Sequence, residues 1–223
     1  MRSMTATGTA LTRTASTAAL RRGRRAAKEY VGVLQACALL EQPMGAAAFT
    51  LLTTLLRPHE MMRSSTVVVD GMLHVVQGPA HHGPVSARVV PLPEFSASVL
   101  AGDEGPLPGL LCLPGPQPGL FLAELSNALE AARDVAGDPV VARHLQLHQL
   151  LPLALNALLA AAWGPDQRIA VMAYAGVAPL GVRAARDRAE LDERDLRFVA
   201  RLVDELVTGA GYAVIIPVGA ASA

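Results

Sequence analysis

Apolar residues recur with two different spacings in the first hundred positions. In residues 26–40 they return every three or four positions, which predicts a helix with one apolar face. A second apolar helix is predicted over residues 46–56. The pattern changes in residues 66–76, where two runs rich in β-branched residues flank Asp70-Gly71. This pattern is typical of a hairpin with a type I′ turn. A third strand is predicted over residues 85–92, at an edge of the sheet because prolines limit its hydrogen bonding.

The second half of the chain begins with helical patterns. Residues 120–136 predict a helix with one apolar face, and Asp138-Pro139 is a favourable start for another, which runs to residue 163. Pro152 is expected to kink or split that helix because it has no N–H to donate. Gly164-Pro165 follows as a stop signal.

The last part of the chain is expected to alternate strands with one helix. Arg168–Tyr174 predicts a strand, and residues 180–185 predict a second. Residues 191–209 predict a helix that opens with acidic residues and carries an apolar stripe. A short strand is predicted over residues 212–218. The apolar stripe of the helix over 191–209 consists of Leu196, Val199, Leu202, Val203, Leu206 and Val207.

This order of elements predicts an α+β fold in which helices pack on a small, mostly antiparallel sheet. The expected parts are a disordered basic arm over residues 1–25, a helical hairpin with a β-hairpin over 26–101, a Pro/Gly-rich linker over 102–119 and an α/β segment over 120–223. The two larger parts form either two subdomains or one domain.

Charge is distributed unevenly although the chain has no net charge. Residues 1–28 hold seven of the 19 basic residues and no acidic residue, so they carry +7 while the remainder carries −7. The same segment is rich in Ser, Thr and Ala, which predicts a solvated arm. The arm also has the composition of a mitochondrial or plastid targeting peptide. Contact with nucleic acid is expected only through this arm, because aromatic residues make up only 4% of the chain.

The cysteines and the longest apolar run indicate the cellular compartment of the protein. Cys37 and Cys112 are not paired in a CxxC motif, which favours free thiols in a reducing compartment. The longest uncharged apolar run, residues 145–163, contains His, Gln, Asn and Pro, so a buried helix is expected rather than a membrane span. A cytoplasmic location is therefore predicted, unless residues 1–25 are a targeting peptide.

Candidate chemistry is sparse. His144 and His148 are four residues apart on the predicted helix, a spacing that lets two imidazoles share one metal ion. The pair lacks the glutamate of an HExxH motif. No phosphate loop, nucleophile elbow or other catalytic motif occurs, and no cofactor is predicted.

Residues 150–207 resemble the distal half of type III secretion chaperones and YbjN-like proteins. The resemblance is one of element order: a helix over 150–163 with Asn156, strands over 168–174 and 180–185, and a helix introduced by Leu191-Asp192. It implies an α+β, non-enzymatic, often dimeric protein that binds another polypeptide.

A second resemblance has a different basis. Trp163-Gly164 and the residues up to Gly176 are similar to the tryptophan–glycine helical signature of Bcl-2-like apoptosis regulators, and Leu129–Asp134 is similar to their leucine-to-aspartate groove motif. The resemblance implies an all-helical regulator. The Asp70-Gly71 hairpin does not belong in such a fold.

Three functions therefore remain open. The first is a non-enzymatic protein-binding module, chaperone- or adaptor-like, that forms a homodimer or binds another protein through an apolar surface. The alternatives are a Bcl-2-like apoptosis regulator and a metal-dependent enzyme that uses His144 and His148. The residues expected to bind the partner are Trp163, Ile169, Val171, Tyr174, Leu196, Val199 and Leu202.

Overall fold

The structure is a computed structural model of the 223-residue chain. The residues that it describes are 7–41, 43–61, 67–76, 87–94, 96, 118–177 and 191–209.

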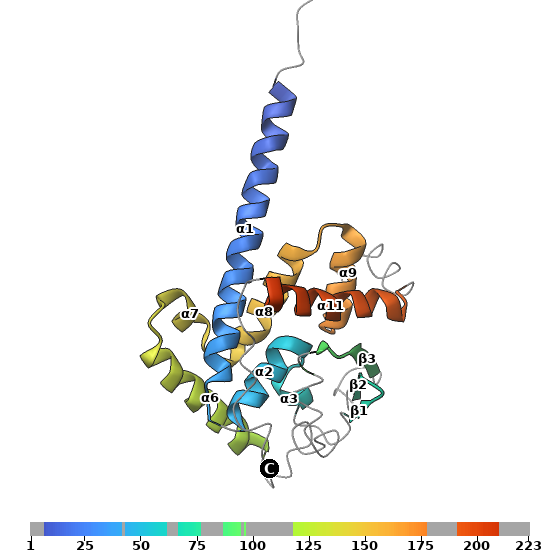
Figure 1. Cartoon of the computed structure of the whole chain (residues 1–223). Helices are drawn as coiled ribbons and strands as arrows, with labels where there is room; N and C mark the ends of the chain where they lie inside the picture. The colour runs from blue at the N-terminus through green and yellow to red at the C-terminus, as the bar shows by residue number, and fades with distance from the viewer. Residues whose placement is uncertain are drawn as a thin grey trace, which may run out of the picture.

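A long helix runs through the centre of the molecule. Helix α1 (Thr7–Ala38) packs against α2 (Met44–Thr54), α7 (Pro139–His144) and α8 (Leu147–Ala161). The packed part of α1 is its C-terminal half, where apolar residues at helical spacing are buried. Figure 1 shows the N-terminal part of α1 extending away from the body.

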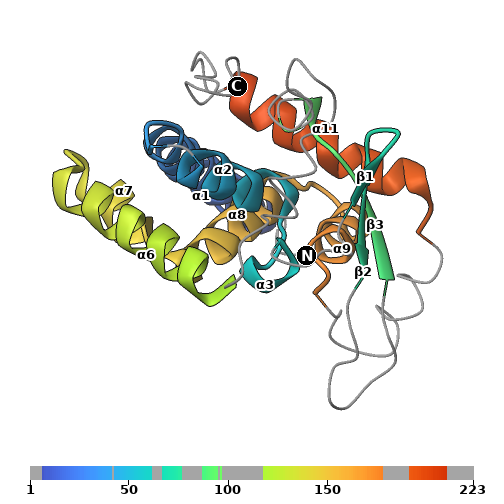
Figure 2. The same cartoon turned by 90° about the horizontal axis from the view of Figure 1, so that it is seen from below.

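The remaining helices surround this centre. Helix α3 (Pro58–Met61) follows α2, while α6 (Pro118–Val135) lies with α7 at one side of the molecule. Helix α9 (Pro165–Tyr174) follows α8 and packs against α11 (Glu193–Gly209). Figure 2 shows α6 and α7 at one edge of the molecule, the sheet at the other, and α1, α2 and α8 between them.

A three-stranded antiparallel sheet of order β1-β2-β3 packs beside α11. Its strands are β1 (Val67–Val69), β2 (Met72–Val76) and β3 (Ala87–Pro91). Val69 pairs with Met72, so Asp70 and Gly71 alone form the connection, with φ values of 51° and 72°. Positive φ at both positions is the requirement of a type I′ turn, so the predicted hairpin is confirmed. The third strand is also confirmed, at an edge of the sheet.

One hydrophobic core joins the two halves of the chain. It includes Tyr30 and Phe49 from the first half and Leu125, Leu158 and Val203 from the second. Small residues such as Ala154 and Ala157 contribute to the buried side of α8, which packs against α1. The fold class is α+β, as predicted. In the described part of the chain, no helix has the length and apolar character needed to cross a bilayer.

Helix α1 begins at Thr7, so its N-terminal part lies within the predicted arm of residues 1–25. Residues 7–25 extend the helix from its packed part, because propagation of an existing helix needs no new nucleus. Their Ala, Leu and Arg residues favour the helix, whereas their Thr and Gly residues do not. Likewise, α6 begins at Pro118, inside the predicted linker.

The predicted strand Arg168–Tyr174 is a helix, α9. Pro165 occupies its first turn, and Ala170, Val171 and Tyr174 are buried at the spacing of one helical face. This tertiary packing outweighs the strand preference of the β-branched and aromatic residues. The predicted strands over 180–185 and 212–218 lie outside the described residues, as does Cys112.

Two helix boundaries follow local chemistry. Asp138 caps α7 as predicted, accepting a hydrogen bond from the Val140 backbone N–H at 2.8 Å. Pro152, however, lies inside α8, and the helix break comes instead between His144 and Leu147. Pro152 is exposed, so the carbonyl that it leaves without an intrahelical partner is on the solvent side.

Candidate functional site

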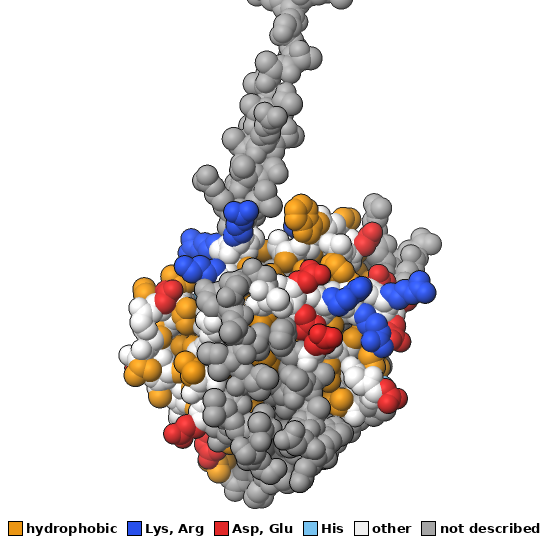
Figure 3. Space-filling view, in the orientation of Figure 1, with side chains coloured by type: hydrophobic (Ala, Val, Ile, Leu, Met, Phe, Trp, Pro, Cys, Tyr) orange, Lys and Arg blue, Asp and Glu red, His pale blue; other side chains and the backbone are white. Residues whose placement is uncertain are grey.

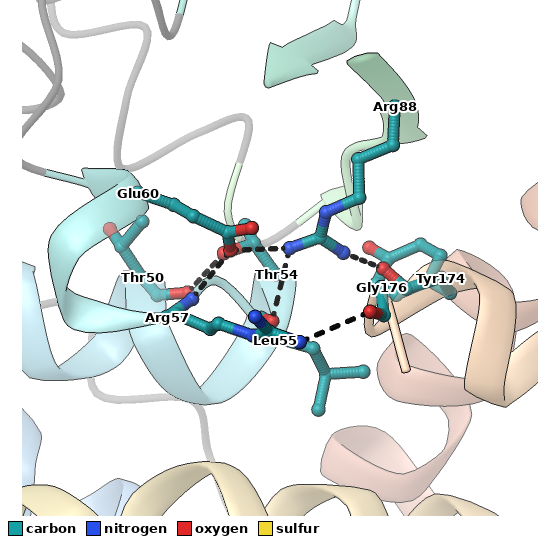
Figure 4. Close-up of polar contacts among 8 residues, drawn as sticks. All are labelled: Thr50, Thr54, Leu55, Arg57, Glu60, Arg88, Tyr174 and Gly176. Atoms are coloured by element: carbon teal, nitrogen blue, oxygen red, sulfur yellow. Dashed lines mark hydrogen bonds and ion pairs between the residues drawn. The ribbon is translucent and has the colours of Figure 1, made fainter. Parts of the chain in front are cut away.

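A buried ion pair joins the sheet to the helices. Arg88 lies on strand β3, where it pairs with the buried Val75 of β2, and its side chain points inward. Nη2 of Arg88 lies 2.8 Å from Oε2 of Glu60. Glu60 is fully buried and Arg88 is 9% exposed. Figure 4 shows the guanidinium between α3 and the end of α9. Burial lowers the pKa of Arg88, and the charge of Glu60 partly offsets this effect.

The same pair closes two helix ends. Arg88 donates to the carbonyl of Leu55 at 3.3 Å, just after α2, and to the carbonyl of Tyr174 at the end of α9. Arg57 donates to the carbonyl of Gly176 at 3.2 Å, and its backbone N–H donates to Glu60 at 2.8 Å (Figure 4). Positively charged side chains stabilise helix C-termini, where the free backbone carbonyls carry partial negative charge. The cluster therefore joins β3 to α2, α3 and α9, and its central ion pair of Arg88 and Glu60 is buried. We refer to this cluster as the latch.

This latch is absent from the predictions made from the sequence. Its hydrogen-bonded pairs are separated by 28 residues or more, apart from the local Arg57–Glu60 contact, so no spacing motif connects them. One signal was present: Arg88 stands in a strand at a position that alternates with the exposed Val89. An arginine on the buried face of a strand requires an acidic partner.

The predicted metal pair is not assembled as expected. His144 ends α7 and His148 belongs to α8, so the two are not on one helical face. Nε2 of His144 instead faces Oε2 of Glu29 at 3.6 Å, while His148 is exposed at a cleft of about 590 Å³ between α6 and α8. Within the described part of the chain, no group of three His, Cys, Asp or Glu side chains is placed to hold a metal ion.

The predicted partner-binding residues divide into two groups. Val171, Tyr174, Val199 and Leu202 are buried where α9 and α11 pack on each other and on the core. These four lie inside the fold because the apolar faces of the two helices cover one another. The remaining three are Trp163, Ile169 and Leu196, of which Ile169 and Leu196 are half-buried.

Trp163 is the most exposed of these residues. Its side chain is 86% exposed, two residues after the end of α8. The end of α8 next to Trp163 contacts α1 at Gly23. The two backbones are so close there that a Cβ added to Gly23 would stand 3.2 Å from the carbonyl oxygen of Ala160. Trp163 therefore lies near the point at which α1 leaves the body. An exposed indole beside a projecting helix is suited to contact with another molecule.

Basic side chains gather at the same point. Arg24, Arg25 and Lys28 of α1 are exposed, and Figure 3 shows Lys and Arg side chains where α1 leaves the body. Nε of Arg25 lies 2.7 Å from Oε1 of Glu29, the first acidic residue of the chain. We refer to Arg24, Arg25, Lys28 and Trp163 as the basal surface. It combines positive charge with one large exposed aromatic side chain.

Comparisons of the chain with models of protein families, with curated proteins and with solved structures found no match. Both family resemblances of the sequence therefore stay predictions.

Proposed function

We propose that the chain is a non-enzymatic protein-binding module, chaperone- or adaptor-like, that binds its partner through the projecting part of α1 and the basal surface. The observation that carries this proposal is that α1 continues outward from Gly23, its contact with α8, to Thr7 (Figure 1). At 1.5 Å per residue, the projecting part is about 24 Å long.

A projecting helix of this length is stabilised when a partner packs along it. Isolated helices of about 12–15 residues are marginal in water, because most helix stability in proteins comes from packing. Residues 7–22 include five threonines and a glycine, which lower helix propensity further. A partner that packs along the helix would supply the missing stabilisation.

Charge indicates the chemistry of the partner. Arg21 and Arg25, and likewise Arg24 and Lys28, are four residues apart, and like charges at this spacing destabilise a helix by about 0.2–0.5 kcal/mol per pair. An acidic polypeptide removes this repulsion. Trp163 beside the same helix supplies the apolar contact that charge alone does not.

Site-specific photo-cross-linking in cells of the native source tests the proposal. A photoreactive residue is placed at position 163 in the full chain, and in the matched control it replaces Glu205, an exposed residue of α11. We expect protein adducts from position 163 that the substitutions Arg24→Glu and Lys28→Glu abolish. Equal adducts from both positions, or no protein adduct at position 163, would contradict the proposal.

A further inference from the structure

The cleft between α6 and α8 is a second candidate binding site. Its volume of about 590 Å³ is within the usual range for sites that hold small molecules or single side chains. Four of the residues that line it form apolar walls: Pro58, at the start of α3, and Leu147, Leu151 and Pro152 of α8. Figure 2 shows these three helices. The walls favour a ligand that has an apolar part.

The charged group of the cleft is a carboxylate. Glu130 of α6 supplies it, and Ser126, four residues earlier on the same face of α6, supplies a hydroxyl. Within the described part of the chain, neither side chain has a hydrogen bond or an ion pair, and no Lys or Arg side chain lines the cleft. A carboxylate beside apolar walls favours a cationic group, because a charge-assisted hydrogen bond is stronger than a neutral one.

Pro152 adds a backbone acceptor to the same cleft. Proline has no N–H, so the carbonyl of His148 has no donor four residues further along α8. Both residues line the cleft, so this carbonyl lies on the side of α8 that faces it. The first turn of α8 also borders the cleft, but its positive partial charge is only about half a unit, less than the full negative charge of Glu130. The cleft therefore attracts positive charge.

We infer that the cleft between α6 and α8 binds an organic cation, a primary ammonium or guanidinium group on an apolar stem. The cation donates hydrogen bonds to the Glu130 carboxylate and the His148 carbonyl, and the stem packs on Leu147 and Leu151. The cleft lies along the first half of α8, whereas Trp163 follows the end of that helix, so the inference does not depend on the proposed function.

An NMR titration of the full chain with n-hexylguanidinium tests the inference. We expect saturable shifts of the residues that line the cleft, with a dissociation constant on the order of 1 mM or lower, which a ligand of this size attains. The neutral n-hexanol and the anionic hexanoate have a similar stem and should bind at least about fivefold more weakly, because the charge-assisted hydrogen bonds are lost. Equal binding of n-hexanol, or no saturable shift at the cleft, would overturn the inference.

A matched pair of variants tests the carboxylate. Glu130→Gln should weaken the binding of n-hexylguanidinium at least about fivefold, because a neutral amide replaces the charged acceptor. Glu124→Gln is the control: it changes another exposed glutamate of α6, one that does not line the cleft, and should leave the affinity unchanged. Equal affinities of the two variants would overturn the inference.

The substitution Pro152→Val separates binding from folding. Valine keeps an apolar wall and supplies the missing N–H, which then donates to the His148 carbonyl. The denaturation midpoint should rise while the affinity for n-hexylguanidinium falls at least about twofold, because one acceptor is lost. General damage to the fold would lower both quantities. A raised midpoint with unchanged affinity would overturn the role of the His148 carbonyl.

A capped tripeptide of leucine, arginine and leucine identifies the source of the cation. Tighter binding of this peptide than of n-hexylguanidinium assigns the cleft to an arginine side chain of a polypeptide, whereas weaker binding assigns it to a free small molecule. Both results support the inference. The same peptide with glutamine in place of arginine is the control, and equal binding of the two peptides together with no binding of n-hexylguanidinium would overturn it.

Discussion

Gly176 lies directly against the guanidinium of Arg88. A Cβ at Gly176 would stand 3.1 Å from Nε and 3.2 Å from Cζ of Arg88. Gly176 also has a φ of 65°, where it ends α9 with a hydrogen bond from its N–H to the carbonyl of Ala173 at 3.0 Å. The residue therefore meets two requirements at once: a left-handed backbone and space for the arginine.

Replacing Gly176 by alanine should destabilise the protein more than the same change at Gly71. Gly71 has a similar φ of 72° but nothing within 4 Å of its Cβ position, so Gly71→Ala measures the backbone cost alone, about 1 kcal/mol. Gly176→Ala adds displacement of Arg88. Chemical denaturation of both variants gives the comparison, and equal losses would show that the guanidinium moves aside freely.

Removing one member of the Arg88–Glu60 pair should cost about 3–5 kcal/mol, because the other charge is left buried without its partner. Arg88→Met and Glu60→Met are the single variants. The double variant should lose less than the sum of the two, since no buried charge remains. Denaturant midpoints of the four proteins test this, and additive losses would mean that the pair is not coupled.

Alkaline conditions should destabilise the fold. Burial raises the pKa of the Cys37 thiol from its usual 9.0 to about 12, and it also raises the pKa of the buried Tyr30 and Tyr174. Because these folded-state pKa values exceed the unfolded ones, the associated stability is complete below about pH 9 and declines as the pH rises toward 12. Urea denaturation between pH 8 and 11 measures the decline; a flat profile would contradict it.

The indole of Trp163 should be accessible in the monomer. Its 86% exposure predicts strong quenching by acrylamide and almost no loss of stability in Trp163→Ala, within about 0.5 kcal/mol. Leu202→Ala is the buried comparison and should cost about 2–5 kcal/mol, because that side chain is only 7% exposed. Weak quenching at protein concentrations where the chain is monomeric would place Trp163 under another part of the chain.

Elements with local signals could be predicted from the order of amino acids alone. Asp70-Gly71 sets the hairpin because the two residues accept positive φ, and the side chain of Asp138 begins α7 by accepting a backbone hydrogen bond. Helix α11 begins in the same way: Asp192 accepts hydrogen bonds from the N–H groups of Arg194 and Asp195 at 2.7 and 3.1 Å. Such contacts lie within a few residues, so the order of amino acids specifies them.

The remaining features depend on long-range packing. Residues 168–174 form a helix because one helical face is buried against α11, although their composition favours a strand. Arg88 and Glu60 meet across 28 residues of sequence, and Trp163 is exposed because other side chains fill the core. These outcomes depend on which surfaces are covered after folding, a long-range property that no local pattern of residues specifies.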